Sequence, residues 1–224
     1  MKQTAFLLVA TALLVASCGN RSTQNRVEGT EAQAAAHTST ETSVAIDTSA
    51  SALHWKGFKP MGSHHGTLKI KAGTLLVADS QPVGGTFILD MNSIDCEDLT
   101  PTTGKEQLEN HLKSEDFFEV TTYPEATFTI TSITPLTEGE QTHRISGNLL
   151  LKGVEKNISF EARISYVDGV YRASTPVFTI DRTQWNVTYK SKSLFSDLKD
   201  SFINDEMEIS LDICSSTPTT SAAN

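Results

Sequence analysis

Residues 145–164 read ISGNLLLKGVEKNISFEARI, and the fold class follows from this stretch. Apolar side chains or glycine occupy every second position from Ile145 to Leu151 and again from Ile158 to Ile164. Successive side chains of a strand point to opposite faces of a sheet, so this period of two indicates strands with one buried and one wet face. The Lys152-Gly153 pair between the two runs is typical of a tight turn. The stretch therefore predicts an antiparallel hairpin.

The same alternation recurs in six further segments of the chain. Residues 71–73 and 168–169 carry additional turn signals. Eight such strands in one domain indicate a sandwich or a closed barrel. The residues that share the apolar faces of the six segments are Leu53, Trp55 and Gly57; Gly66, Leu68 and Ile70; Gly85, Phe87, Leu89 and Met91; Ala126, Phe128 and Ile130; Phe178 and Ile180; and Met207, Ile209, Leu211 and Ile213.

Two segments break the alternation and indicate short helices. Thr103 and Glu106 have the spacing of a capping box, and Leu108 and Leu112 then share one helical face. Residues 194–198 indicate a second short helix. We therefore predict a mainly β fold, an extended eight-stranded antiparallel β-barrel with short helices at its mouth.

Three glycines lie on the apolar faces of the predicted strands, at Gly66, Gly85 and Gly147. Glycine weakens a strand, and it often marks close approach by a ligand or by another backbone. A bend or bulge in a tightly curved barrel explains it equally well. Both interpretations stay open at this point.

Composition excludes several classes of protein. The chain has 224 residues, 38% hydrophobic and 20% charged, which does not fit a polytopic membrane protein or a wholly disordered one. Its net charge of -9 argues against a nucleic-acid partner, which requires a basic face. Three cysteines are too few for a disulfide-built scaffold.

The N-terminus predicts export and lipidation. Residues 5–16 form an apolar run that is too short to span a bilayer but suits a signal peptide. Small residues before Cys18 resemble a bacterial lipobox, which implies cleavage before this cysteine and its acylation. An ordinary secretory signal is the alternative. Residues 19–42 are polar and small, which predicts a flexible tether.

The predicted organisation has four parts. These are a lipoprotein signal peptide over residues 1–17, the acylated Cys18 and tether over 18–42, a barrel domain over 43–214, and a disordered tail over 215–224. No acidic run follows Cys18, so we expect a periplasm-facing protein that is lipid-anchored to a cell-envelope membrane.

Several motifs resemble the YceI-like family of lipid-binding proteins. The most specific are HLKSEDFFEV at 111–120 and YPEATF at 123–128, and residues 147–156 match the pattern G-x-L-x-x-x-G-V-x-K. Residues 87–94 and 180–182 also fit. The resemblance implies a lipocalin-like barrel whose apolar lumen holds a long isoprenoid chain, such as a polyprenyl phosphate or a quinone tail. It implies no established catalytic residues.

Binding such a chain requires only a row of apolar side chains along a tunnel. The alternative for each of these residues is ordinary core packing. The predicted lumen residues are Trp55, Leu68, Phe87, Leu89, Phe128, Ile130, Leu149, Phe160, Phe178 and Leu211.

A polar head group needs donors near the mouth of the barrel. The candidates are Lys113, Arg182 and Tyr189, and arginine suits a phosphate. The favoured alternative for Arg182 is an ion pair with Asp181 or Asp197 that orders the rim.

Histidine and cysteine leave two further questions open. His64 and His65 lie in a turn, and with His111 and His54 they could assemble a metal site. We favour a solvated pair at the rim and predict no metal and no cofactor. An oxidising compartment allows a bridge between Cys96 and Cys214, which we do not favour.

Three functions follow, in order of preference. The first is a membrane-anchored protein that holds a polyisoprenoid or quinone-type lipid. The second is an enzyme that acts on an amphiphile in the lumen, although the chain has no recognisable nucleophile-and-base motif. The third is a ligand-free structural or interaction barrel. The expected partners are the lipid and, through Cys18, the membrane, and a homodimer is an open alternative.

Overall fold

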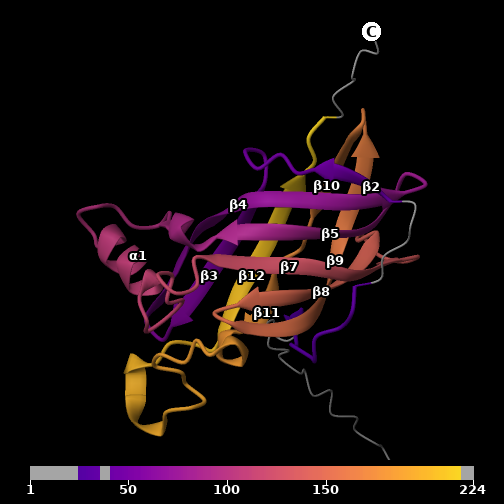
Figure 1. Ribbon diagram of the computed structural model, residues 1–224. Helices are drawn as coiled ribbons and strands as arrows, with labels where there is room; N and C mark the ends of the chain where they lie inside the picture. The colour runs from indigo at the N-terminus through magenta and orange to yellow at the C-terminus, as the bar shows by residue number, and fades with distance from the viewer. Residues whose placement is uncertain (1–24, 36–40, 218–224) are drawn as a thin grey trace, which may run out of the picture.

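The computed structural model describes residues 25–35 and 41–217 (Figure 1). Within these residues there is one α-helix, α1 (Lys105–Lys113), together with the short 3₁₀ helices η1 (Met91–Ser93), η2 (Arg182–Trp185) and η3 (Ser196–Ser201). The strands within the described ranges are β1 (Arg26–Val27), β2 (Thr42–Ala45), β3 (Ala52–Lys59), β4 (Gly62–Ala78), β5 (Gln81–Asp90), β6 (Asp95–Cys96), β7 (Glu125–Pro135), β8 (His143–Leu151), β9 (Val154–Val167), β10 (Val170–Ser174), β11 (Phe178–Asp181) and β12 (Glu206–Cys214).

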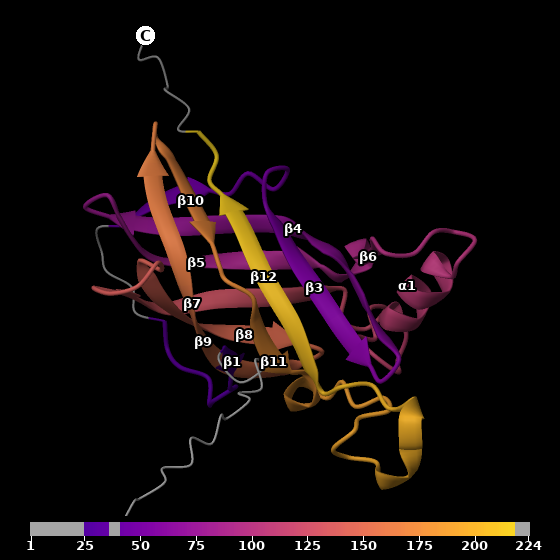
Figure 2. The same cartoon turned by 180° about the vertical axis from the view of Figure 1, so that it is seen from behind.

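Antiparallel pairing closes the sheet into a barrel. From β3 the neighbours are β4, β5, β7, β8, β9 and β10; β10 pairs with β12, which returns to β3. Strands β10 and β11 pair with consecutive stretches of β12, so they are two parts of one broken strand. Pro176, which has no N–H to donate, lies at the break. The predicted eight-stranded barrel is confirmed, and Figure 2 shows β3 and β12 crossing in front of β5 and β7.

Two of the three predicted turns are hairpin turns. Lys152-Gly153 and Asp168-Gly169 all have positive φ, as a two-residue turn of the common hairpin type requires. The turn predicted at residues 71–73 is wrong, because β4 runs straight through it. The pairing of β4 with β5 instead shifts by one residue between Ile70 and Ala72, which is a β-bulge.

The chain's own atoms explain the three glycines. A Cβ on Gly66 would lie 1.8 Å from the carbonyl oxygen of Asp95, and one on Gly85 would lie 2.6 Å from that of Thr74. A Cβ on Gly147 would lie 2.3 Å from the ring of Phe128. These positions admit neighbouring backbone and an aromatic ring, so they mark close packing within the barrel.

The helix at 105–113 forms as predicted, but its start differs from the predicted capping box. Gly104, with a φ of 103°, precedes the helix and has no side chain to cap it. The hydroxyl of Thr103 bonds to the backbone of Thr100 instead. Leu108 and Leu112 still share the face that turns toward the barrel interior. The second predicted helix corresponds to η3.

Part of the predicted tether is docked onto the barrel. Strand β1 pairs in parallel with β11, and Thr30 exchanges backbone hydrogen bonds with Asn157 of β9. Residues 25–30 thereby occupy the gap between β9 and β11, which do not pair with each other. Val27, the only large aliphatic residue between positions 19 and 42, is buried in the core. The expectation of a flexible tether over 18–42 therefore does not hold for residues 25–35.

We expect Val27→Asp to release this segment. Burial of a valine side chain is worth about 1.5–3 kcal/mol, and a carboxylate at this position would need to reach water. Amide hydrogen exchange of residues 26–30 should rise to that of an unprotected chain. Glu31→Gln, an exposed position in the same segment, is the control. Unchanged protection in Val27→Asp would contradict the assigned role of this side chain.

Candidate functional site

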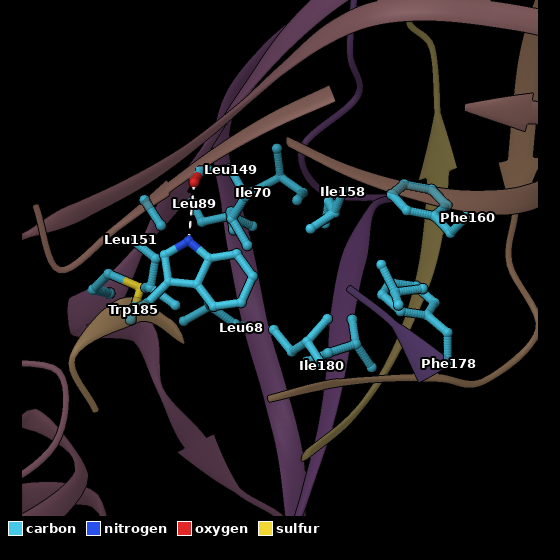
Figure 3. Packing of buried hydrophobic residues seen from close by; sticks show 14 of the residues in the cluster. Leu68, Ile70, Leu89, Leu149, Leu151, Ile158, Phe160, Phe178, Ile180 and Trp185 are labelled. Atoms are coloured by element: carbon cyan, nitrogen blue, oxygen red, sulfur yellow. Dashed lines mark hydrogen bonds between the residues drawn. The ribbon is translucent and has the colours of Figure 1, made fainter. Parts of the chain in front are cut away.

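The barrel encloses a cavity of about 420 Å³, within the range of pockets that hold small organic ligands. All ten residues predicted to face the lumen line it. Figure 3 shows Leu68, Leu89, Leu149, Phe160 and Phe178 within this apolar interior. Their contact with a ligand remains a prediction.

Aromatic rings form part of the lumen wall. Phe160 and Phe178 stack with their centroids 4.9 Å apart, and Phe128 lies 5.6 Å from Phe160. Trp185, which the sequence analysis missed, is fully buried and donates its indole N–H to the carbonyl oxygen of Leu149 (Figure 3). Trp185 does not itself line the cavity, but Leu149, 36 residues earlier in the chain, does. These aromatic contacts fix the wall around the empty space.

Polar groups gather at the two ends of the lumen. The strand register places the last residues of β3 beside the first residues of β4 and the segment before β12, and it places β10 and the last residues of β12 at the opposite end. Apolar side chains separate the two groups, so the cavity suits a long apolar molecule with a polar end. The first end carries Lys59, His64, Arg182, Asn204 and Glu206, and the second carries Tyr171, Arg172, Thr175 and Ser215.

Arg182 is the predicted head-group candidate that reaches the lumen. Only 4% of it is exposed, and it donates hydrogen bonds to the carbonyl oxygens of Val187, Tyr189, Ile203 and Asn204. Its ionic partner is Asp205, at 3.8 Å, rather than the predicted Asp181 or Asp197. Burial lowers the pKa of Arg182, and nearby carboxylates oppose this effect. All five partners lie between residues 187 and 205, so these contacts tie the start of the 182–205 segment to its middle and its end.

The other two head-group candidates lie elsewhere. The ring of Tyr189 packs against His111 and Phe117, with centroids 4.9 and 5.3 Å away, and it does not line the lumen. Lys113 lies on a separate surface hollow formed by residues 113–122. The structure therefore does not bring the three candidates together around one head group. Figures 1 and 2 show that α1 and the 182–205 segment lie at the same end of the barrel.

The histidines do not form the four-residue cluster that a metal site built from them would need. His54 lies 3.5 Å from Asp212, and His111 lies 2.9 Å from Asp116. His64 lies beside Asp98 instead, with 2.9 Å between Nδ1 and Oδ2. Among the described residues, Cys96 and Cys214 are both buried free thiols, so they do not form a bridge.

Hydrogen bonds surround the carboxylate of Asp98. Burial alone would raise its pKa, but bonds from the backbone of His65 and from the side chains of His64 and Cys96 outweigh this effect, and the pKa falls well below its usual value. Burial raises the pKa of the Cys96 thiol. An ionised carboxylate thus lies next to a thiol and an imidazole.

We expect His143 to make the barrel less stable in mild acid. Burial lowers the pKa of His143 in the folded chain, whereas the unfolded chain takes up the proton near pH 6.5. Below that pH the unfolded state binds more protons, so the free energy of unfolding falls as the pH falls. Chemical denaturation of His143→Gln between pH 8 and 5 should show a smaller loss. His54→Gln is the control, and identical pH profiles for wild type and His143→Gln would contradict the prediction.

Across the described part of the chain, we find no helix with the length and apolar character needed to cross a membrane.

Comparisons with known proteins agree with this architecture. The family model for the YceI-like domain matches residues 44–214. Protein YceI from Shigella flexneri is 32% identical over 100 residues, which cover 45% of this chain and 48% of that protein. Protein YceI from Salmonella newport is 33% identical over 102 residues, with the same coverage. The chain thus spans about half the length of these curated relatives.

Two solved structures share the fold. BcnA from Burkholderia cenocepacia superposes with a TM-score of 0.59 at 19% identity, over 76% of this chain and 99% of that one. A polyisoprenoid binding domain from Saccharophagus degradans, implicated in plant cell wall breakdown, gives 0.55 at 16% identity, over 78% and 98%. At these identities the likeness concerns the fold alone.

Proposed function

The chain belongs to the YceI-like domain family, and from this premise we propose that it is a binding protein that holds a long apolar lipid in the barrel lumen. The observation that carries the proposal is the apolar cavity of about 420 Å³ with polar groups at its ends. The Saccharophagus degradans domain, which has the same fold, is a polyisoprenoid binding domain. We therefore propose a ligand of the polyisoprenoid or quinone type.

The energetics of burial support a chain-like ligand. Each buried CH₂ group contributes about 0.8 kcal/mol, so one five-carbon isoprene unit contributes about 4 kcal/mol. Three buried units give about 12 kcal/mol before the cost of association, so binding stays close to micromolar, about 8 kcal/mol, when about 4 kcal/mol is lost to that cost. No charged partner is required in the middle of the lumen.

The polar groups at the Arg182 end of the lumen favour a binding role over a catalytic role. Arg182 is engaged by four carbonyl oxygens, and His64 by Asp98. Side chains held in this way order the rim of the barrel. A general base or nucleophile would instead have to be free to contact the reacting group of a substrate. We therefore propose a binding role for this barrel.

The direct test is to identify what the chain retains. The full chain, expressed in a bacterium and purified in mild detergent, is examined by native mass spectrometry and then extracted with organic solvent. A bound mass that extracts as an isoprenoid is the expected result. A chain that carries no lipid, and that takes up neither a quinone nor a polyprenyl phosphate on titration, would overturn the proposal.

We further propose that Cys18 anchors the protein to a cell-envelope membrane. Cys18 lies outside the described residues, and the support is the lipobox-like sequence before it. Two or three acyl chains on one cysteine give stable membrane binding. Cys18→Ser should therefore move the protein from the membrane to the soluble fraction and abolish labelling by a radioactive fatty acid. Cys96→Ser is the control, and labelling that survives in Cys18→Ser would contradict the assignment.

A further inference from the structure

A cluster of three different potential metal ligands lies where β6 pairs with β4. Gly66 of β4 is opposite Cys96 of β6. The two strands are antiparallel, so His64, two residues before Gly66, lies opposite Asp98, two residues after Cys96. Because side chains alternate along paired strands, His64 and Asp98 fall on the same face as Cys96. The absent side chain of Gly66 lets the segment at 95–98 lie close to β4.

The distances within the cluster are short. His64 Nδ1 lies 2.9 Å from Asp98 Oδ2, and Cys96 Sγ lies 3.2 Å from Asp98 Oδ1. One ligand atom from each of the three residues lies within 4.8 Å of the other two. Zinc–ligand bonds of about 2.0–2.3 Å place the ligands of a tetrahedral ion about 3.3–3.7 Å apart. The His64–Asp98 and Cys96–Asp98 distances are within about half an ångström of this spacing, and the His64 and Cys96 ligand atoms lie within 4.8 Å of each other.

Hydrogen bonds with neighbouring groups hold Asp98 and the backbone of Cys96 in place. The backbone N–H of His65 donates to Asp98 Oδ1 at 2.9 Å, and the backbone N–H of Cys96 donates to Glu109 Oε1 at 2.8 Å. Cys96 is fully buried, while the side chains of His64 and Asp98 are 26% and 22% exposed. Outer hydrogen bonds of this kind orient metal ligands. The cluster is therefore both ordered and reachable from solvent.

We propose that His64, Cys96 and Asp98 bind a divalent transition-metal ion of the zinc class. Imidazole nitrogen, thiolate sulfur and carboxylate oxygen are the ligand types that Zn²⁺ takes. On binding, the thiol releases its proton to solvent, the sulfur binds as thiolate, and a water molecule occupies the fourth position. This site uses none of the other three histidines considered from the sequence. It lies beside the lumen, because His64 also lines the cavity.

The test uses Co²⁺ and Zn²⁺ as probes. The full chain without a histidine tag is treated with a chelator and titrated with Co²⁺. We expect one equivalent to bind with visible bands of a tetrahedral ion and a near-ultraviolet band from a cobalt–thiolate bond. Zn²⁺ should displace it, and calorimetry should give one Zn²⁺ per chain.

Variants then assign the ligands. Cys96→Ser should remove the thiolate band, and Cys96→Ser and His64→Gln should each weaken Zn²⁺ binding at least a hundredfold. His54→Gln removes an exposed histidine on the neighbouring β3 and should bind as the wild type does. Far-ultraviolet circular dichroism checks the fold of each variant.

Two results would overturn the proposal. One is the absence of stoichiometric Zn²⁺ binding by the wild-type chain. The other is wild-type affinity in both Cys96→Ser and His64→Gln, which would assign the ion to adventitious surface carboxylates. The cluster would then be a hydrogen-bond network that fastens the 95–98 segment to β4.

Discussion

Leu211→Trp is expected to lower the affinity for an isoprenoid lipid by between tenfold and a thousandfold. Leu211 lies on β12, lines the lumen and is only half-buried, so its side chain borders the empty space. An indole there would take the place of roughly one isoprene unit, which contributes about 4 kcal/mol. Since 1.4 kcal/mol is a factor of ten, full loss of that unit weakens binding about a thousandfold. A lipid chain that shifts along the lumen would recover part of this loss of binding free energy.

The matched control for this variant is Ser210→Trp. Ser210 is the preceding residue of the same strand, so its side chain points to the outer face, opposite His54 of β3. Titration of both variants with a quinone, followed by fluorescence or native mass spectrometry, gives the comparison. Equal affinities would place the ligand outside the lumen. A similar melting temperature in both variants would show that the loss of affinity does not come from a loss of stability.

The lumen is predictable from sequence because it depends on a local rule. Alternation along each strand assigns side chains to the inner or outer face without knowledge of which strands are neighbours. All ten predicted lumen residues therefore line the cavity. The same rule does not locate the ends of strands, and for that reason the bulge in β4 was interpreted as a turn.

Features that depend on partners far apart in the chain cannot be predicted from local alternation. The burial of Val27 docks residues 25–30 between β9 and β11. The composition of this segment, which is polar and small, instead predicts a flexible tether. The proposed metal ligands His64, Cys96 and Asp98 meet only because the two-residue strand β6 pairs with β4. No spacing rule in the sequence joins residues so far apart. The ion pair of Arg182 with Asp205 is of the same kind.

Arg182→Met should destabilise the barrel by about 3–5 kcal/mol, because removing one partner of a buried ion pair leaves the other charge poorly compensated. The variant also leaves four carbonyl oxygens without their donor. For a domain of this size, 1 kcal/mol shifts the melting temperature by about 2–4 °C, so we expect a fall of roughly 6–20 °C. The measurement is thermal unfolding followed by circular dichroism.

Two further variants separate this structural role from head-group binding. Arg172→Met removes an arginine that lines the opposite end of the lumen but is exposed, and it should change the melting temperature little. Asp205→Asn, combined with Arg182→Met, removes the uncompensated charge and should recover part of the lost stability. If Arg182 were chiefly a head-group ligand, Arg182→Met would keep its melting temperature within about 2 °C and lose lipid affinity instead. Because four carbonyl oxygens surround its guanidinium group, we expect the reverse: Arg182→Met lowers the melting temperature, and any loss of lipid affinity follows from the loss of stability.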